Sequence, residues 1–117
     1  MEYIEGLVAA VPTESKAAYI EHARRAGEVF RSHGALRLVE CWGDDVPPGE
    51  VTSFPRAVQC RDDETVVFSW IVWPSREARN AGMAAIMGDA EMSALMEAMP
   101  FDGGRLIYGG FEVILDE

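Results

Sequence analysis

Apolar positions recur along the chain with two different periods, and proline, glycine and aspartate residues separate the segments. Runs dominated by β-branched and aromatic residues are typical of strands, whereas apolar residues three or four positions apart are typical of helices. The pattern predicts, in order, a strand at 2–11, a helix at 14–33, strands at 36–43 and 65–73, a helix at 75–87, a short helix at 91–98 and a strand at 106–115.

Local signals define the ends of the predicted helices. Thr13 is a favourable N-cap for the first helix, and Gly34 can adopt the left-handed conformation that ends it. Ser75 is the expected cap of the second long helix, and Gly88 follows its last turn. The pattern is weak between residues 51 and 61, where Pro55 favours a short helix.

The order of the elements predicts an α+β fold. Two successive β-α-β units are the pattern of the ferredoxin-like fold, βαββαβ, in which a four-stranded antiparallel sheet carries both long helices on one face. A parallel sheet would need a long crossover helix between the second and third strands, and the connection at 44–64 contains none. We therefore expect a single ferredoxin-like domain over residues 1–117.

The strands are apolar on both faces, which has a consequence for assembly. In the third strand Val67, Ile71 and Trp73 alternate with Phe68 and Trp70, so neither face is polar. Helices on one side leave the other face uncovered, with an area of about 400 Å² for four strands of ordinary length. We expect a homodimer in which two sheets pack face to face; the alternative is that the connection at 44–64 folds over the sheet.

Composition and charge exclude several classes of function. Hydrophobic residues make up 49% of the 117 residues, and 10 Lys and Arg stand against 20 Asp and Glu, giving a formal net charge of −10. A phosphate backbone or an anionic membrane surface binds cationic faces, so we expect no nucleic-acid or membrane partner. The acidic start with Glu2 and Glu5 opposes a secretory signal, and the two cysteines lack a CxxC spacing. We therefore expect a cytoplasmic protein.

Few residues suggest chemistry. The two histidines, His22 and His33, are about 16 Å apart along the first predicted helix and cannot share a metal ion. Zinc, nucleotide-binding and serine-hydrolase motifs are missing, so we expect no metal and no cofactor. Cys41, Asp44 and Asp45 follow the second strand, and the pattern leaves open whether they have a role beyond structure.

Three segments resemble a known family. They are HGALRLVECWGDDVP at 33–47, VVFSWIVWPS at 66–75 and MPFDGGRLIYGGF at 99–111. The chain resembles the YbaA-like family of small bacterial proteins of unknown function over nearly its whole length. That resemblance implies a ferredoxin-like subunit that pairs as a dimeric α+β barrel. The wider superfamily includes cofactor-independent oxygenases, haem-degrading enzymes and ligand-sensing domains, and the fold does not select among them.

Two functions remain open at this point. In the first, a pocket between sheet and helices binds or transforms a small apolar or aromatic molecule, with cofactor-independent oxygenation as the leading reaction if the protein is an enzyme. In the second, the protein is a non-catalytic structural or protein-interaction dimer. The residues expected to line the pocket, with His33 as the candidate for an acid–base group, are Phe30, His33, Trp42, Trp70, Met83, Met87 and Phe101.

Overall fold

A computed structural model describes all 117 residues and contains one four-stranded sheet. The strands are β1 (Tyr3–Pro12), β2 (Arg37–Trp42), β3 (Glu64–Trp73) and β4 (Ile107–Glu112). They lie in the order β2-β3-β1-β4, and every neighbouring pair is antiparallel. The predicted ferredoxin-like α+β fold is confirmed.

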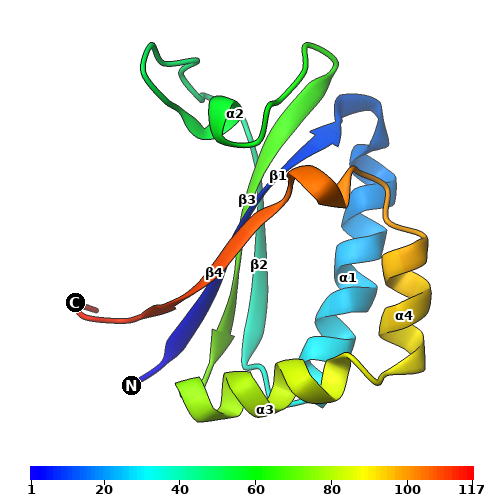
Figure 1. The fold of residues 1–117 in the computed structure, drawn as a ribbon, viewed down its shortest axis with the longest axis vertical. Helices are drawn as coiled ribbons and strands as arrows, with labels where there is room; N and C mark the ends of the chain where they lie inside the picture. The colour runs from blue at the N-terminus through cyan, green and yellow to red at the C-terminus, as the bar shows by residue number, and fades with distance from the viewer.

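The main helices cover one face of this sheet (Figure 1). They are α1 (Lys16–Ser32), α3 (Arg76–Ile86) and α4 (Ala90–Glu97). Figure 1 shows α1 and α4 side by side along the sheet, whereas α3 lies across its lower end. A short helix, α2 (Phe54–Ala57), lies in the connection between β2 and β3 at the other end of the sheet. None of these helices combines the length and the apolar character that a bilayer span requires.

Several predicted boundaries hold, and their caps are present. The Ser75 side chain accepts a hydrogen bond from the amide of Ala78 at 3.0 Å, which begins α3 as expected. Gly34 has φ of +108° and ends α1 in the left-handed conformation. The Ser53 side chain caps α2 one residue before Phe54, in the segment where Pro55 favoured a short helix.

Two boundaries differ from the prediction. Thr13 does not cap α1: residues Thr13–Ser15 form a 3₁₀ turn, and the Thr13 hydroxyl lies 2.7 Å from the hydroxyl of Thr65 on β3. The last strand ends at Glu112 rather than at 115, because its pairing partner β1 begins at Tyr3, which lies opposite Glu112.

The core lies mainly between the sheet and the helices. Trp73 and Ile71 of β3 are almost fully buried there against Val29 of α1 and Ile86 of α3. On the opposite face, Val58 of the β2–β3 connection packs on Val8 near one end of the sheet. The connection therefore covers part of this face, and Phe68, Ile107 and Phe111 stay exposed on the rest.

Candidate ligand cavity

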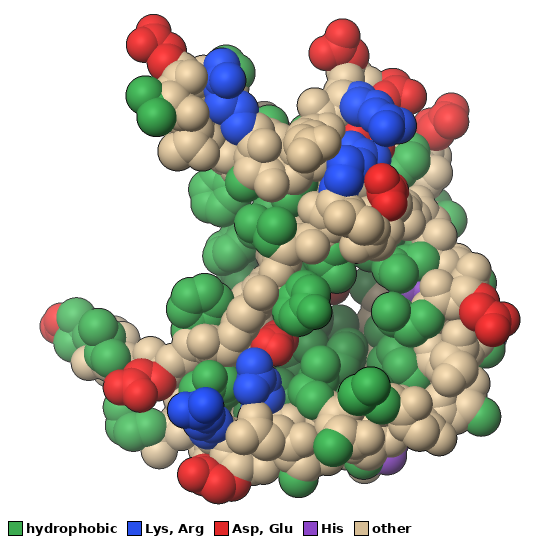
Figure 2. Space-filling model, in the orientation of Figure 1, with side chains coloured by type: hydrophobic (Ala, Val, Ile, Leu, Met, Phe, Trp, Pro, Cys, Tyr) green, Lys and Arg blue, Asp and Glu red, His purple; other side chains and the backbone are tan.

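A cavity of about 580 Å³ lies between the helix-facing side of the sheet and the three main helices. Figure 2 shows apolar side chains gathered in the hollow between the strands and the helices. Ten of the twelve lining residues are hydrophobic. The lining residues are Glu5, Leu7, Phe30, Ile71, Met83, Ile86, Met87, Met92, Ser93, Met96, Leu106 and Tyr108.

The cavity exists because α3 and α4 are two helices rather than one. α3 ends at Ile86, and the Asp89 side chain begins α4 by accepting a hydrogen bond from the amide of Met92 at 3.1 Å. The chain turns between the two helices, so α4 runs beside α1 while α3 crosses the end of the sheet (Figure 1). This arrangement leaves open space over the inner face of β1 and β4 at Leu7 and Tyr108, whereas α1 packs on β1 farther along, at Ala9 and Val11.

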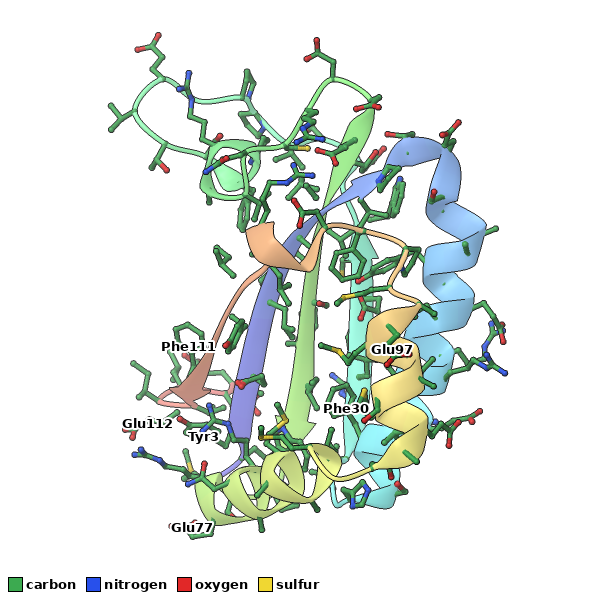
Figure 3. The ribbon with its side chains drawn as sticks, turned by 45° about the vertical axis from the view of Figure 1, so that its right-hand side comes forward. Tyr3, Phe30, Glu77, Glu97, Phe111 and Glu112 are labelled. Carbon is green, nitrogen blue, oxygen red and sulfur yellow. The ribbon has the colours of Figure 1, made fainter.

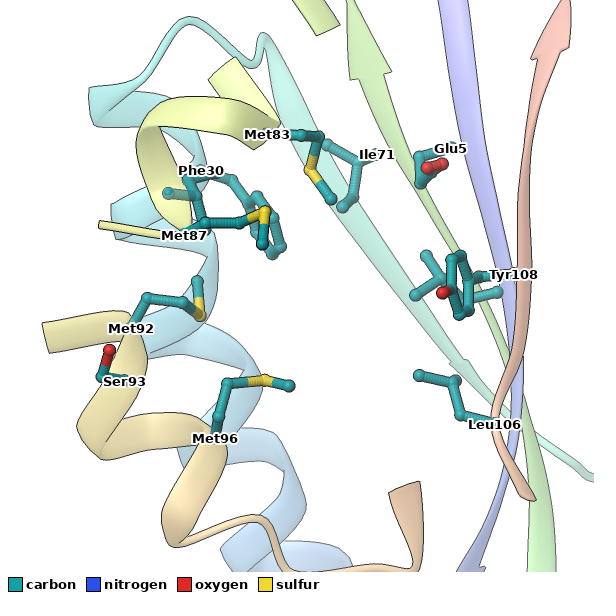
Figure 4. Close-up of a pocket in the computed structure, with 12 residues that line it drawn as sticks. Glu5, Phe30, Ile71, Met83, Met87, Met92, Ser93, Met96, Leu106 and Tyr108 are labelled. Carbon is teal, nitrogen blue, oxygen red and sulfur yellow. The ribbon is translucent and has the colours of Figure 1, made fainter. Parts of the chain in front are cut away.

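Four methionines form much of the helical wall. Met83 comes from α3, Met87 follows its end, and Met92 and Met96 are one turn apart on α4. Figure 4 shows these side chains and Phe30 directed towards Glu5 on β1, Tyr108 on β4 and Leu106, which directly precedes β4. Met92 is buried, whereas Met87 and Met96 are exposed. Methionine side chains are flexible and polarisable, so this wall can adapt to the shape of an apolar ligand.

The strand wall carries one charged group, the carboxylate of Glu5. Glu5 is 3% exposed, and both of its carboxylate oxygens accept a hydrogen bond from Nη2 of Arg79 on α3 at 3.2 Å. The other terminal nitrogen of Arg79 donates to the side chain of Asn80, and the guanidinium lies over the ring of Tyr3. A buried carboxylate is stable in an apolar wall only with such a partner.

Gly110 on β4 makes room for this ion pair. A Cβ atom at Gly110 would lie 2.5 Å from Nη2 of Arg79 and 2.5 Å from the hydroxyl of Tyr3. The glycine lies opposite Glu5 in the β1–β4 register, so it is level with the carboxylate. Figure 3 shows Tyr3 near the end of β4, where Phe111 and Glu112 lie.

Three of the seven residues predicted for the pocket line this cavity: Phe30, Met83 and Met87. His33 does not, and this corrects its expected position at a pocket mouth. Its Nε2 lies 3.0 Å from a carboxylate oxygen of Asp89, so it ties the end of α1 to the start of α4. The hydrogen bond from His33 is the main reason that the pKa of Asp89 lies below its ordinary value.

The other three predicted residues also lie outside the cavity. Trp42 and Phe101 pack against the ring of Tyr19, with centroids 6.4 Å and 5.6 Å away, near the other end of α1. Trp70 lies on the opposite face of the sheet, where its ring is 5.4 Å from that of Phe68. Both sheet faces are apolar, and the hydrophobic pattern alone did not distinguish the face that the helices cover.

Sequence reasoning missed Glu5 and Arg79. One signal was present: Glu5 lies between Tyr3 and Leu7 at a position that faces the helices in the alternation of β1. A carboxylate at an inward position of a strand requires a partner, and such a residue is a candidate for function. No signal identified Arg79 as that partner, because 74 positions separate the two residues.

A second polar contact lies between α1 and the sheet. The hydroxyl of Tyr19 donates a hydrogen bond of 2.6 Å to a carboxylate oxygen of Glu40 on β2. Burial raises the pKa of Glu40, while the hydrogen bond from Tyr19 lowers it. Burial, followed by the charge of Glu40, raises the pKa of Tyr19. The pair therefore holds its proton on the tyrosine.

Cys41, Asp44 and Asp45 line a smaller cavity of about 280 Å³ beside the β2–β3 connection. Neither cysteine forms a disulfide. The structure contains no group of three or more His, Cys, Asp or Glu side chains placed to hold a metal ion. We assign no chemistry to this smaller cavity.

Comparison with known proteins identifies the family. The model of a family described as "Protein of unknown function (DUF1428)" matches residues 2–103. This chain belongs to that family. It is 53% identical over 117 residues to the uncharacterized protein YbaA of Escherichia coli K12, and the match covers the whole of both chains. The uncharacterized YbaA of Shigella flexneri matches to the same extent. The resemblance to the YbaA-like family is therefore confirmed.

Solved structures of other proteins share the fold. One is SnoaB, a cofactor-independent oxygenase from Streptomyces nogalater, with a TM-score of 0.64 and 14% identity over 98% of this chain and 95% of that one. A putative antibiotic biosynthesis monooxygenase from Nitrosomonas europaea has a TM-score of 0.58 and 15% identity, covering 97% of this chain and 90% of that one. At these identities the likeness establishes the fold alone.

Proposed function

We propose that this protein binds a small apolar or aromatic molecule in the cavity between the sheet and the helices. The observation that carries the proposal is a cavity of about 580 Å³ with ten hydrophobic residues among the twelve that line it. Ligand sites are commonly about 300–1,000 Å³, mostly apolar, with a few polar groups that orient the ligand. Glu5, Ser93 and Tyr108 supply the polar groups here.

The size of the cavity favours a ligand over a structural void. Protein interiors are close-packed and contain few voids larger than a water molecule. Met87 and Met96 are 86% and 55% exposed at the cavity, so apolar surface faces water there without a ligand. An apolar ligand would cover this surface and fill the space between the methionines and the strands.

A cavity-filling variant tests this proposal. Leu7 lies on β1 and lines the cavity, so Leu7→Trp would occupy part of the space. We expect compounds from an aromatic library to raise the melting temperature of the wild type but not of Leu7→Trp. Leu36→Trp, at a half-exposed position outside the cavity lining, is the matched control and should respond as the wild type does. An unchanged melting temperature of the wild type across the library would contradict the proposal.

The catalytic form of the proposal is cofactor-independent oxygenation of the bound molecule. The fold shared with SnoaB, named as a cofactor-independent oxygenase, supports this form, together with an apolar cavity that has few polar groups. In an oxygen electrode, aromatic compounds that bind should cause oxygen consumption with the wild type and not with Leu7→Trp. A ligand that binds tightly and causes no consumption would indicate a binding protein rather than an oxygenase.

We also propose that the working unit is a homodimer joined through the open faces of two sheets. On this face the positions around Phe68 on β1, β3 and β4 are uncharged; Glu64, at the start of β3, is paired with Arg105, and Arg37 lies at the edge on β2. Phe68, Ile107 and Phe111 are 44%, 44% and 62% exposed. Such a face does not attract a charged partner, and it matches the same face of a second copy. A non-catalytic interaction dimer would use this same surface.

The oligomeric state tests the dimer. We expect wild-type protein to sediment as a dimer at micromolar concentration and Phe68→Glu to sediment as a monomer, because the variant places a charge on the open face. Ile20→Glu is the control, since Ile20 is 47% exposed on α1, behind the other face of the sheet. A monomeric wild type would contradict the proposal.

We also propose that the protein is cytoplasmic. Cys41 and Cys60 are free thiols, which are typical of a reducing compartment. Cell fractionation tests this: the protein is expected with cytoplasmic markers, and recovery with periplasmic or membrane markers would contradict it.

A further inference from the structure

The carboxylate of Glu5 is the feature of the cavity that the apolar character of its ligand does not explain. It is the single charged group in the lining, and its side chain is 4% exposed. A strand position facing an apolar core is ordinarily apolar, and a buried carboxylate carries a large desolvation cost. A role in ligand recognition accounts for a costly group at this place.

The hydrogen bonds of Glu5 within the protein are incomplete. A carboxylate has about four acceptor sites, and here both oxygens share one nitrogen, Nη2 of Arg79, at 3.2 Å each. Charge-assisted hydrogen bonds are usually about 2.7–2.9 Å long. The contact therefore neutralises the charge of Glu5 and leaves acceptor capacity for a further donor in the cavity.

Arg79 is held in place by contacts that a ligand need not disturb. One terminal nitrogen donates to the side-chain oxygen of Asn80 at 2.8 Å, and the guanidinium lies 5.2 Å from the centre of the Tyr3 ring. Gly110 provides the space that the guanidinium occupies. These contacts fix Arg79, so Glu5 keeps its counter-charge whether or not a ligand is bound.

We propose that Glu5 accepts a hydrogen bond from a hydroxyl group of the ligand and that the cavity selects neutral hydroxylated aromatic molecules. Because Arg79 already balances the charge of Glu5, a charged ligand of either sign would add an unpaired charge to an apolar cavity. The four methionines contact the aromatic body, since sulfur makes favourable contacts with ring edges. Glu5 is then a specificity-determining residue, and Arg79 is the positioning residue that holds its carboxylate in place.

This inference rests on the proposed function, and its test separates the two. The probes are 2-naphthol and 2-methylnaphthalene, which have nearly the same shape and differ in the hydroxyl group. Equilibrium dialysis of the wild type should give at least about tenfold tighter binding of 2-naphthol, which is the order expected for a hydrogen bond to a charged group. Equal binding of the two probes would overturn the role of Glu5 and leave the binding function intact, whereas binding of neither would overturn both.

Three variants assign the preference to Glu5. Glu5→Gln should reduce the preference for 2-naphthol, and the double variant Glu5→Leu with Arg79→Met should abolish it while 2-methylnaphthalene still binds. If Glu5→Gln folds poorly, the double variant still tests the role of Glu5, because it removes both charges and leaves no unpaired ion in the core. Glu64→Gln is the matched control, because Glu64 is paired with Arg105 outside the cavity lining; it should keep the wild-type preference.

Two further measurements can overturn the inference. If Tyr108→Phe abolished the preference and Glu5→Gln did not, Tyr108 rather than Glu5 would be the anchor. The charged analogues 2-naphthoate and (2-naphthyl)methylammonium should both bind more weakly than 2-naphthol. Tighter binding of either ion would contradict selection of a neutral ligand.

Discussion

Gly82 provides a sharp test of how α3 packs against the sheet. This glycine lies within α3, and its Cα faces the buried ring of Trp73 on β3. A Cβ atom at this position would lie 2.6 Å from Cη2 of Trp73 and 2.7 Å from the backbone oxygen of His33. Trp73 is 0% exposed, so its ring has no free space into which it could move.

The expected effect of Gly82→Ala is a balance of two terms. Alanine is favoured over glycine within a helix by about 1 kcal/mol. Overpacking a well-packed core costs about 1–3 kcal/mol, and the cost is at the upper end when the clashing atoms are a buried ring and a backbone oxygen. We expect a net loss of about 2 kcal/mol in the free energy of unfolding. For a chain of this size, that loss corresponds to a fall in melting temperature of about 8 °C.

A second helical glycine provides the control. A Cβ at Gly27 in α1 would lie 3.2 Å from Nη1 of Arg31 and 3.2 Å from Cδ2 of Leu38, which are both ends of flexible side chains. Gly27→Ala should therefore match or slightly exceed the stability of the wild type. Thermal unfolding followed by circular dichroism measures both variants. If Gly82→Ala were as stable as Gly27→Ala, the close packing of α3 on Trp73 would be wrong.

Three other predictions follow from polar contacts. Hydrogen bonds from Arg105 lower the pKa of Glu64 to about 2. The wild type should therefore be more stable than Arg105→Met above pH 4.5 and lose this advantage as the pH falls towards 2. Denaturant titrations across this pH range measure the difference, and an equal loss of stability in both proteins would contradict the prediction. Tyr19→Phe removes a hydrogen bond that lowers the pKa of Glu40, so NMR titration should show that pKa higher still, and a fall would refute the assignment. His33→Ala should destabilise the fold but leave the affinity for 2-naphthol unchanged, because His33 lies outside the cavity lining.

The strands could be predicted because their signals are local. β3 is rich in β-branched and aromatic residues, and its observed bounds, Glu64–Trp73, differ from the predicted ones by one residue. The predicted cap at Thr13 was wrong, because the Thr13 hydroxyl contacts that of Thr65, which is 52 positions away, and nothing local in the sequence indicates this contact. A residue that locally favours an N-cap position does not cap the helix when its side chain forms a tertiary hydrogen bond instead.

The lining of the cavity matches the expected pocket residues only in part, for a related reason. Phe30, Met83 and Met87 line the cavity because their positions on or beside the helices bring apolar side chains to the space over the sheet. Trp70 was assigned to the cavity, but its strand is apolar on both faces, so hydrophobicity did not indicate its side. The Glu5–Arg79 pair joins β1 to α3, and only the folded chain brings the two residues together.

The central claim is that a small apolar molecule binds among the methionines of the cavity, and methionine methyl NMR tests it directly. Four of the six methionines line the cavity, whereas Met1 and Met99 do not. When 2-naphthol is added to protein labelled with ¹³C at its methionine methyl groups, the signals of the four lining residues should shift and saturate together, while those of Met1 and Met99 stay in place. Absence of any shift, or shifts confined to Met1 and Met99, would contradict the claim.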